Sequence, residues 1–404
     1  MTTRQDERTT GLYPEFPALD TLRLVGALMV LTTHTAFWAG AYTMPGPWGT
    51  VLARLDVGVA VFFVLSGFLL SRPWIARAHL GLAAPAVGRY FWKRVLRILP
   101  LYLVVVVLAL TLIDQQGRVT WTHWLSTLTM TDIYVRDTLP AGLTQMWSLA
   151  TEVAFYVALP AIMLLGVGRG KRLVPRRLVA VLTALAVVNL VWLGGFSARF
   201  RGAEERAVNE WLPAYLIWFA LGIGLALLQV LHSSGAAPRS LSHSVNLLSS
   251  LPGTCWAIAA GSLFIAATPL TGPTLLVAAT TTDALVKNLL YAIIGGALVF
   301  TGIFTSPTSR YHAVMAHPWL RHLGHISYGI FCIHLPILHF VMWSTGFELF
   351  QGHGPQIWAL TLVLSVAAAE VLYRLIELPF MRLKNLGRGS AATTRAADSA
   401  TSTR

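Results

Sequence analysis

Two ionisable residues in the first apolar stretch of the chain, Arg23 and His34, have the types and spacing of a catalytic pair. They are eleven residues apart, which in a helix is about 20° past three full turns, so both side chains project from one face about 16 Å apart along the axis. Such a histidine can act as a general base, and the guanidinium group can stabilise an oxyanion. The alternative is structural: a snorkelling arginine and a hydrogen-bonded histidine inside a helix bundle.

A carboxylate at a similar predicted depth, Glu152, is the expected partner of His34. At 1.5 Å per residue, each lies about 7 Å outward of the midpoint of its own predicted span. We therefore expect Glu152 to contact His34, fix its tautomer and raise its basicity. The predicted catalytic residues are His34, Arg23 and Glu152. The alternative is a pair that only holds two helices together.

A cluster of cations follows at residues 89–97, where Arg94 and Arg97 share a helix face. Guanidinium groups bind phosphate with two parallel hydrogen bonds, which favours a phosphate or pyrophosphate site. Lys93 belongs to the same cluster, and Ser66 lies in a stretch of small residues that lets a ligand approach closely. These four residues are the predicted cofactor-binding set. The alternative is a topology signal that contacts anionic lipid headgroups.

Other polar residues of the apolar stretches have weaker signals. Ser66 lacks the Gly-x-Ser-x-Gly context of a hydrolase nucleophile. His334 is expected near mid-membrane as a hydrogen-bonded histidine of the bundle. No pair of histidines has zinc-site spacing with a carboxylate on the same helix, so we predict no metal.

The elements that must position these residues are membrane helices. Of 404 residues, 55% are hydrophobic and 12% are charged, against about 25% charged in an average soluble domain. We predict an all-α, polytopic bundle of ten transmembrane helices, with a membrane domain over 19–380, a cytoplasmic segment at 1–18 and a disordered cytoplasmic tail at 381–404. The apolar runs lie near 19–39, 56–71, 98–113, 147–167, 178–195, 211–231, 253–269, 284–304, 326–342 and 356–376.

The distribution of positive charge predicts the orientation. With a cytoplasmic N-terminus, 22 of the 30 Lys and Arg residues fall in inside segments, seven fall outside and Arg23 lies within a span. This positive-inside bias places both termini in the cytoplasm and the chain in the cytoplasmic (inner) membrane as a multi-pass protein. The net charge of +13 is spread between apolar runs and not along one recognition face, so we expect no nucleic-acid partner.

Six short motifs occur in order along residues 19–380, and together they resemble the acyltransferase-3 family of membrane acyltransferases. One position, Ala60, departs from the family, where many relatives carry a polar or acidic residue. The motifs are Leu19-Asp20-Thr21-Leu22-Arg23 with His34; Phe62-Phe63-Val64-Leu65-Ser66-Gly67-Phe68; Arg94-x-x-Arg97-Ile98-x-Pro100-x-Tyr102; Trp147-Ser148-Leu149 with Glu152 and Phe155-Tyr156; Ser327-Tyr328 with His334-x-Pro336; and Glu377-Leu378-Pro379-Phe380.

The resemblance implies a function. It implies a cytoplasmic acyl-CoA donor, with acetyl-CoA as the default, and an acceptor hydroxyl on a sugar, a glycolipid or a similar molecule. It also implies that the Arg23–His34 pair is essential. His34 would take the proton of the hydroxyl as its oxygen attacks the thioester.

Several alternatives stay open. We expect direct transfer, but the sequence is also compatible with an acyl-histidine intermediate. The sequence does not determine the acyl group, the acceptor or the oligomeric state. The competing function is a transporter or flippase of a lipid-linked or anionic substrate, which would not release free CoA.

Overall fold

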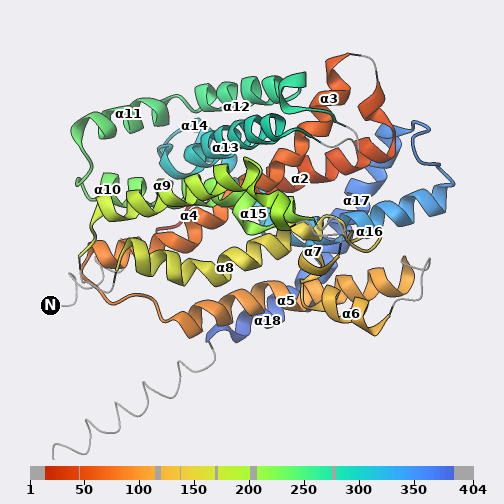
Figure 1. Ribbon diagram of the computed structural model, residues 1–404, viewed down its shortest axis with the longest axis horizontal. Coiled ribbons are helices and arrows are strands. Elements are labelled where there is room, and N and C mark those ends of the chain that lie inside the picture. Colours follow the sequence, from red (N-terminus) through yellow and green to blue (C-terminus); the bar gives the residue numbers. More distant parts are fainter. Residues whose placement is uncertain are drawn as a thin grey trace, which may run out of the picture.

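The computed structural model describes residues 14–44, 46–113, 120–136, 138–168, 172–200, 207–274 and 279–385, and this part of the chain is a helical bundle without a strand (Figure 1). The predicted all-α class is therefore confirmed. The long helices are α2 (Ala18–Trp38), α4 (Gly58–His79), α5 (Val87–Leu112), α8 (Met146–Gly166), α9 (Pro175–Leu193), α10 (Leu216–Ser233), α12 (Pro252–Ala266), α13 (Thr281–Phe304), α16 (Ser327–Thr345) and α17 (Gly354–Leu372).

Shorter helices connect or extend these. They are α3 (Pro47–Ala53), α6 (Trp121–Leu128), α7 (Asp132–Val135), α11 (Arg239–Ser250), α14 (Arg310–Met315), α15 (Pro318–His325) and α18 (Leu378–Arg382), with a π-helical turn, η7 (Tyr373–Glu377), and a final 3₁₀ turn, η8 (Leu383–Asn385).

Eight described helical segments are long and apolar enough to cross a membrane, and the pair α11–α12, bent by 84°, brings the number to nine. This composition is that of a multi-pass membrane protein. Helix α2 is 21 residues long but is not among the nine, because Asp20, Arg23, His34 and several threonines reduce its hydropathy. The predicted count of ten includes α2 and stays a prediction.

Three predicted boundaries differ from the structure. The second and third apolar runs are parts of longer helices, since α4 continues to His79 and α5 already begins at Val87. Polar and basic residues extend both helices beyond their apolar segments, which a hydropathy criterion excludes. The predicted tail also begins too early, because α18 and η8 continue to Asn385. Residues 1–13 and 386–404 lie outside the described residues.

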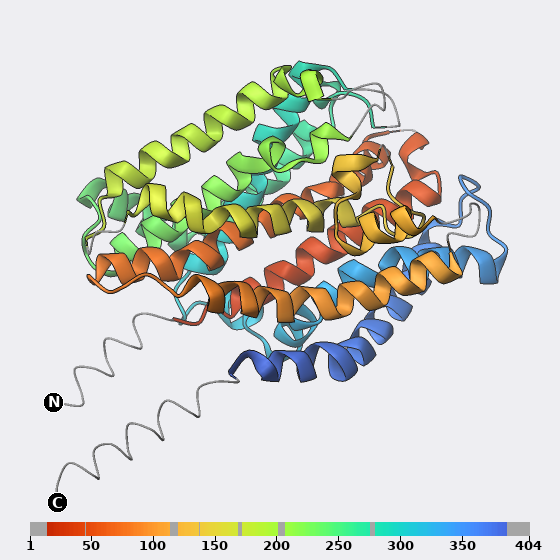
Figure 2. The ribbon, with the colours of Figure 1, turned by 60° about the horizontal axis from the view of Figure 1, so that its bottom comes forward.

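The first and last described segments meet at one end of the bundle. Helix α18 packs beside α5 (Figure 2). Asp20, in the first turn of α2, and Lys384, in η8, line the same cavity. The two described ends of the chain therefore lie on one side of the bundle, and the assignment of that side to the cytoplasm stays a prediction.

Helix α4 forms the centre of the bundle and packs against α2, α8, α10 and α13. Glycines allow these contacts: a Cβ atom at Gly67 would collide with the carbonyl oxygen of Phe219, and one at Gly222 with that of Val64. Gly58 approaches α2 in the same way. Small residues at crossings let membrane helices come into van der Waals contact, which is a main source of their association.

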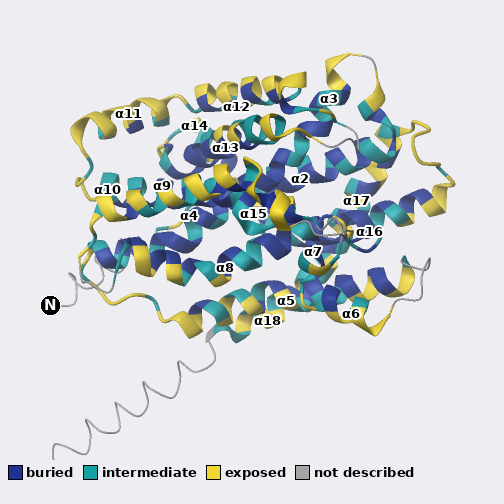
Figure 3. Ribbon diagram, in the orientation of Figure 1, coloured by how far each residue is buried: buried dark blue, intermediate teal, exposed yellow. Residues whose placement is uncertain are grey.

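The outer helices expose apolar residues, as membrane-facing helices do. Figure 3 shows α4 largely buried, whereas α11 and α12 are mostly exposed. On α9, Val187 and Val191 are 51% and 54% exposed. Three rings, Phe63, Phe219 and Phe155, stack at centroid distances of 4.5 and 4.0 Å and join α4, α10 and α8. The central helices are therefore held as one rigid block.

The glycine crossing of α4 and α10 gives a stability prediction. Gly222→Ala should lower the free energy of unfolding by roughly 1–3 kcal/mol, because the added methyl group overpacks a backbone contact that has no room to relax. Gly224→Ala on the same helix is the matched control, since its Cβ would meet only Leu182 at 3.7 Å. Thermal unfolding of the detergent-solubilised protein measures both, and equal melting temperatures for the two variants would contradict the prediction.

Candidate functional site

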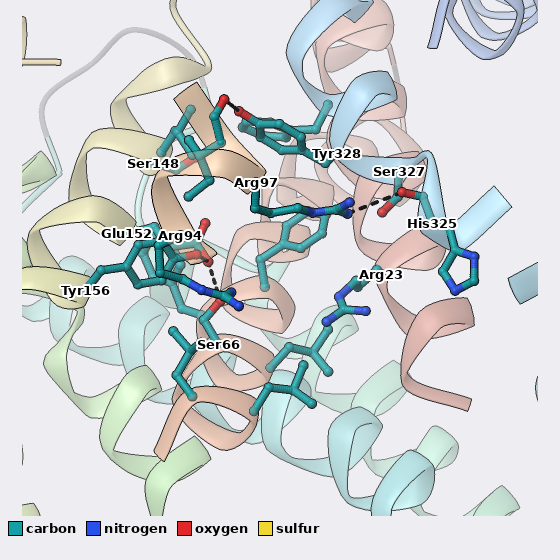
Figure 4. Close-up of a pocket in the computed structure, with 18 of the residues that line it drawn as sticks. Arg23, Ser66, Arg94, Arg97, Ser148, Glu152, Tyr156, His325, Ser327 and Tyr328 are labelled. Carbon is teal, nitrogen blue, oxygen red and sulfur yellow. Dashed lines mark hydrogen bonds between the residues drawn. The ribbon is translucent and has the colours of Figure 1, made fainter. Parts of the chain in front are cut away.

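A cavity of about 470 Å³ opens between α2, α4, α5, α8 and α16, beside η7 and η8. Charged and polar side chains line one part of it, including Arg23, Arg94 and Arg97 (Figure 4). Apolar side chains, including Phe62 and Phe331, line the rest. The cavity therefore combines a charged compartment with an apolar one.

Arg23 lines the cavity and is paired locally. Its Nη1 donates a hydrogen bond of 2.7 Å to Oδ1 of Asp20, one helical turn earlier. The other oxygen of Asp20 lies 3.5 Å from Nε of Arg321 and 3.3 Å from Nε2 of His325, which both come from α15. Asp20 thus fixes the guanidinium group of Arg23 and ties the start of α2 to α15.

Arg97 lines the same cavity and is paired with a distant carboxylate. Its Nη1 lies 3.0 Å from Oε2 of Glu377, whose side chain is 1% exposed. Its Nη2 donates to the carbonyl oxygen of His325 at 3.3 Å, and its guanidinium group lies over the ring of Tyr328 at 5.9 Å. Arg97 therefore fixes α5 against η7 and α16.

Arg94 is the third guanidinium group of the cavity, and it is not paired. Its Nε is buried, and among the described residues it has neither an ion-pair partner nor a hydrogen bond. Figure 4 shows its guanidinium group directed into the space between Glu152 and Arg23. A buried, unsatisfied donor of this kind is costly unless a ligand satisfies it.

Glu152 lies near Arg94 but is occupied by hydroxyl groups. Ser66 of α4 donates a hydrogen bond to its Oε1, and Tyr156, one turn later on α8, donates to the same oxygen at 2.5 Å. Ser66 and Glu152 both line the cavity, so the structure brings Ser66 together with Arg94 and Arg97 as predicted. These contacts leave Arg94 available to bind an anion.

Among the described residues, Lys384 is the fourth cation that lines the cavity, whereas Lys93 does not line it. Burial, followed by the charges of Arg97 and Arg94, lowers the pKa of Lys384. Lys93 is exposed and does not line the cavity, because one residue of helix turns it about 100° away from Arg94. Of the predicted set, Lys93 alone does not line the cavity, whereas Lys384, which was not predicted, does. The described lining holds four permanent cations against the carboxylates of Asp20 and Glu152.

His34 contacts a histidine and not a carboxylate. Its Nδ1 lies 2.9 Å from Nε2 of His334 on α16, and the two rings stack at a centroid distance of 5.1 Å. The predicted contact between His34 and Glu152 is wrong. Equal predicted depth does not bring them together, because α4 packs between α2 and α8 and supplies Ser66 as the neighbour of Glu152.

The histidine pair lies next to the apolar end of the cavity but does not line it. The ring of Phe331 is 6.1 Å from that of His334 and 5.9 Å from that of Phe62. Phe62 and Phe331 both line the cavity. We call these two rings the aromatic floor. Although Arg23 and His34 share one helix face, they do not line the same space: Arg23 lines the cavity and His34 lies near the far side of the floor.

Sequence reasoning missed Lys384 and the roles of Asp20 and Glu377. Asp20 precedes Arg23 by one helical turn, a spacing that already indicates an ion pair. Lys384 and Glu377 carried no such signal, because they follow Arg97 by more than 270 residues. Across the described ranges, no three His, Cys, Asp or Glu side chains are grouped as a metal site requires.

Comparison with known proteins gives one family. A family model for an acyltransferase domain, that of the acyltransferase-3 family, matches residues 16–374. No solved structure matches this chain.

Curated relatives are similar at 25–27% identity. The peptidoglycan O-acetyltransferase OatA of Listeria monocytogenes is 25% identical over 93% of this chain and 57% of its own length. The putative peptidoglycan O-acetyltransferase YrhL of Bacillus subtilis is 26% identical over 90% and 54%. The acyltransferase MdmB of Streptomyces mycarofaciens is 27% identical over 94% of each chain. The chain thus spans little more than half of the first two and nearly all of the third.

The Arg97–Glu377 pair gives a prediction about the architecture of the site. Arg97→Met should lower the free energy of unfolding by roughly 3–5 kcal/mol, because it leaves the buried carboxylate of Glu377 unpaired. Arg94→Met is the matched control on the same helix, and it should unfold close to the wild type because Arg94 has no partner to lose.

The double variant Arg97→Met/Glu377→Gln should recover most of the lost stability. Melting temperatures in detergent test this. An Arg97→Met protein as stable as Arg94→Met would show that the ion pair does not hold the site together.

Proposed function

Because this chain belongs to the acyltransferase-3 family, we propose that it is a membrane O-acyltransferase that moves an acyl group from acyl-CoA to an acceptor hydroxyl. Acetyl-CoA is the simplest donor, and an acetyl group agrees with the names of the two O-acetyltransferase relatives. Those names also favour a sugar-containing acceptor. The observation that carries the proposal is the cavity that Arg94 lines together with Arg23 and Arg97, where it has no hydrogen-bond or ion-pair partner among the residues that the structure describes.

The charged compartment suits the phosphate groups of coenzyme A. Arg94 offers a guanidinium fork with no competing carboxylate in an ion pair, and guanidinium groups bind phosphate with two hydrogen bonds. Lys384 adds a cation whose pKa is lowered first by burial and then by the charges of Arg97 and Arg94, and a bound anion would stabilise its charged form. Ser66 lies within the same cavity. We assign Arg94, Lys384 and Ser66 to the donor, with Arg97 and Arg23 as the fixed walls.

The apolar compartment suits the pantetheine arm and the acyl group. It runs from the arginines to the aromatic floor of Phe62 and Phe331. The thioester would therefore approach the floor while its phosphates stay with Arg94. Burial of apolar ligand surface contributes about 25 cal/mol per Å² to such binding.

The reaction itself needs a base near the floor, and we assign this role to His34, which contacts His334 beside Phe331. His34 takes the proton of the acceptor hydroxyl while that oxygen attacks the thioester carbonyl. The C–S bond then breaks, and the imidazolium returns the proton to the leaving thiolate. Arg23 lies about 16 Å from His34 along α2, too far to stabilise the same oxyanion, so we assign it to the donor compartment.

This mechanism predicts that His34→Ala lowers acceptor-dependent release of CoA thiol by about 10²–10⁴-fold, the usual contribution of a general base. The assay uses the full chain in liposomes with acetyl-CoA and a panel of soluble muropeptides and methyl glycosides. His339→Ala is the control, since His339 contacts Trp38 on the same pair of helices but not His34. Full activity of the His34→Ala protein at equal protein level would exclude the mechanism. A wild type that releases no thiol with any acceptor would favour the transporter.

Donor binding gives a second prediction. Arg94→Met should raise the KM for acetyl-CoA by about 10–100-fold with little change in kcat, because a hydrogen bond to a charged group is worth roughly 1.5–3 kcal/mol. Lys93→Met removes the same charge from an exposed neighbour outside the cavity and should have little effect. If the KM for acetyl-CoA rose equally in both variants, the general positive potential of this region, and not the cavity, would attract the donor.

A further inference from the structure

We infer that His334 is a positioning residue that fixes the proton of His34 on Nδ1 and leaves Nε2 of His34 as the free basic nitrogen. The inference rests on the proposed function for its kinetic consequence. The proton assignment itself follows from two described hydrogen bonds and from the burial of His334.

The first contact fixes the proton of His334. Its Nδ1 lies 2.7 Å from the carbonyl oxygen of Phe331. A carbonyl oxygen only accepts hydrogen bonds, so Nδ1 of His334 carries a hydrogen.

Burial then decides the charge of His334. The residue is 0% exposed, and among the described residues no carboxylate forms an ion pair with it. A second proton on Nε2 would make a buried imidazolium with no counterion, which costs several kcal/mol. His334 is therefore neutral, and its Nε2 has a lone pair.

The contact between the two rings follows from this lone pair. Nε2 of His334 lies 2.9 Å from Nδ1 of His34, and since His334 accepts, His34 must donate. Neutral His34 thus has its hydrogen on Nδ1, and its Nε2 has the free lone pair. His34 is only partly buried, whereas His334 is fully buried. The unprotonated nitrogen of His34 is therefore more accessible than that of His334.

A rigid frame holds His334 in place. Pro336 lies within α16, and because proline has no backbone N–H, the carbonyl oxygen of Cys332 loses its helical partner. The side chain of Gln145 satisfies that oxygen, with Nε2 donating at 3.0 Å. The turn that carries Phe331 and His334 is therefore fixed from a neighbouring segment, as a positioning group requires.

During transfer, the arrangement acts as a neutral counterpart of a carboxylate–histidine pair. When Nε2 of His34 accepts the hydroxyl proton, its Nδ1–H becomes a charge-assisted donor to His334. The proton later passes from Nε2 of His34 to the departing sulfur, so the protonation state of His334 does not change during the reaction.

Two variants separate the acceptor role from simple packing. The side-chain oxygen of His334→Gln reaches about the position of Nε2 and accepts the hydrogen bond, whereas His334→Met fills the space without a comparable acceptor. We expect His334→Met to lose about 10²-fold in kcat with both KM values unchanged, and His334→Gln to stay within about tenfold of the wild type, in the muropeptide assay with acetyl-CoA. His339→Met is the matched control on the same helix. Equal kcat losses in the Gln and Met variants, or no loss in either, would overturn the inference.

Solid-state ¹⁵N NMR of the histidine-labelled protein gives an independent measurement that needs no activity. The wild type should show His34, assigned by its loss in His34→Gln, with a protonated Nδ1 and an unprotonated Nε2. His334→Gln should keep this tautomer and His334→Met should lose its preference. A wild-type His34 protonated on Nε2 would overturn the inference even in an active enzyme. The expected tautomer without any acyl transfer would instead reject only the proposed function.

Discussion

The cavity depends on the pairing of guanidinium groups inside an apolar bundle. Removing an ion from water costs several kcal/mol, which only a well-placed partner offsets. Asp20 supplies that partner for Arg23, and Glu377 supplies it for Arg97. Asp20 also contacts Arg321 and His325 of α15, and the Arg97–Glu377 pair joins α5 to η7. The carboxylates that make these charges tolerable therefore also hold the walls of the cavity. Among the described guanidinium groups that line the cavity, Arg94 is the one without an ion-pair partner.

Close packing around α4 determines which side chains meet. The glycines that let α10 and α2 approach α4 make it the common neighbour of most long helices. Consequently Ser66 reaches Glu152, while Phe62, one turn earlier on the same face of α4, reaches Phe331. The charged compartment and the aromatic floor thus lie along successive turns of one face of the central helix, and the packing of that helix fixes the distance between them.

The separation also divides the charges by function. Carboxylates and arginines line the charged compartment, where the cations would balance the charge of the proposed anionic donor. The histidine pair lies near the other side of the floor. His34 contacts the imidazole of His334, and His334 contacts the backbone carbonyl oxygen of Phe331. A base supported by neutral groups gains less basicity than one supported by a carboxylate, but it avoids a buried negative charge that would attract the arginines away from the donor.

Local spacing in the sequence was enough to predict the helical membrane class and the shared helix face of Arg94 and Arg97, because both follow from composition and from 3.6 residues per turn. It also indicated that Arg23 and Ser66 belong to a site. It misplaced Glu152 and Lys93, and it did not predict the partner of His34. Depth along a span says nothing about which helix lies between two others, and one residue of rotation separates Lys93 from the cavity. Only the tertiary structure decided that His334, 300 residues away, contacts His34, because helix crossings and the gap left by Pro336 are set by packing between distant segments.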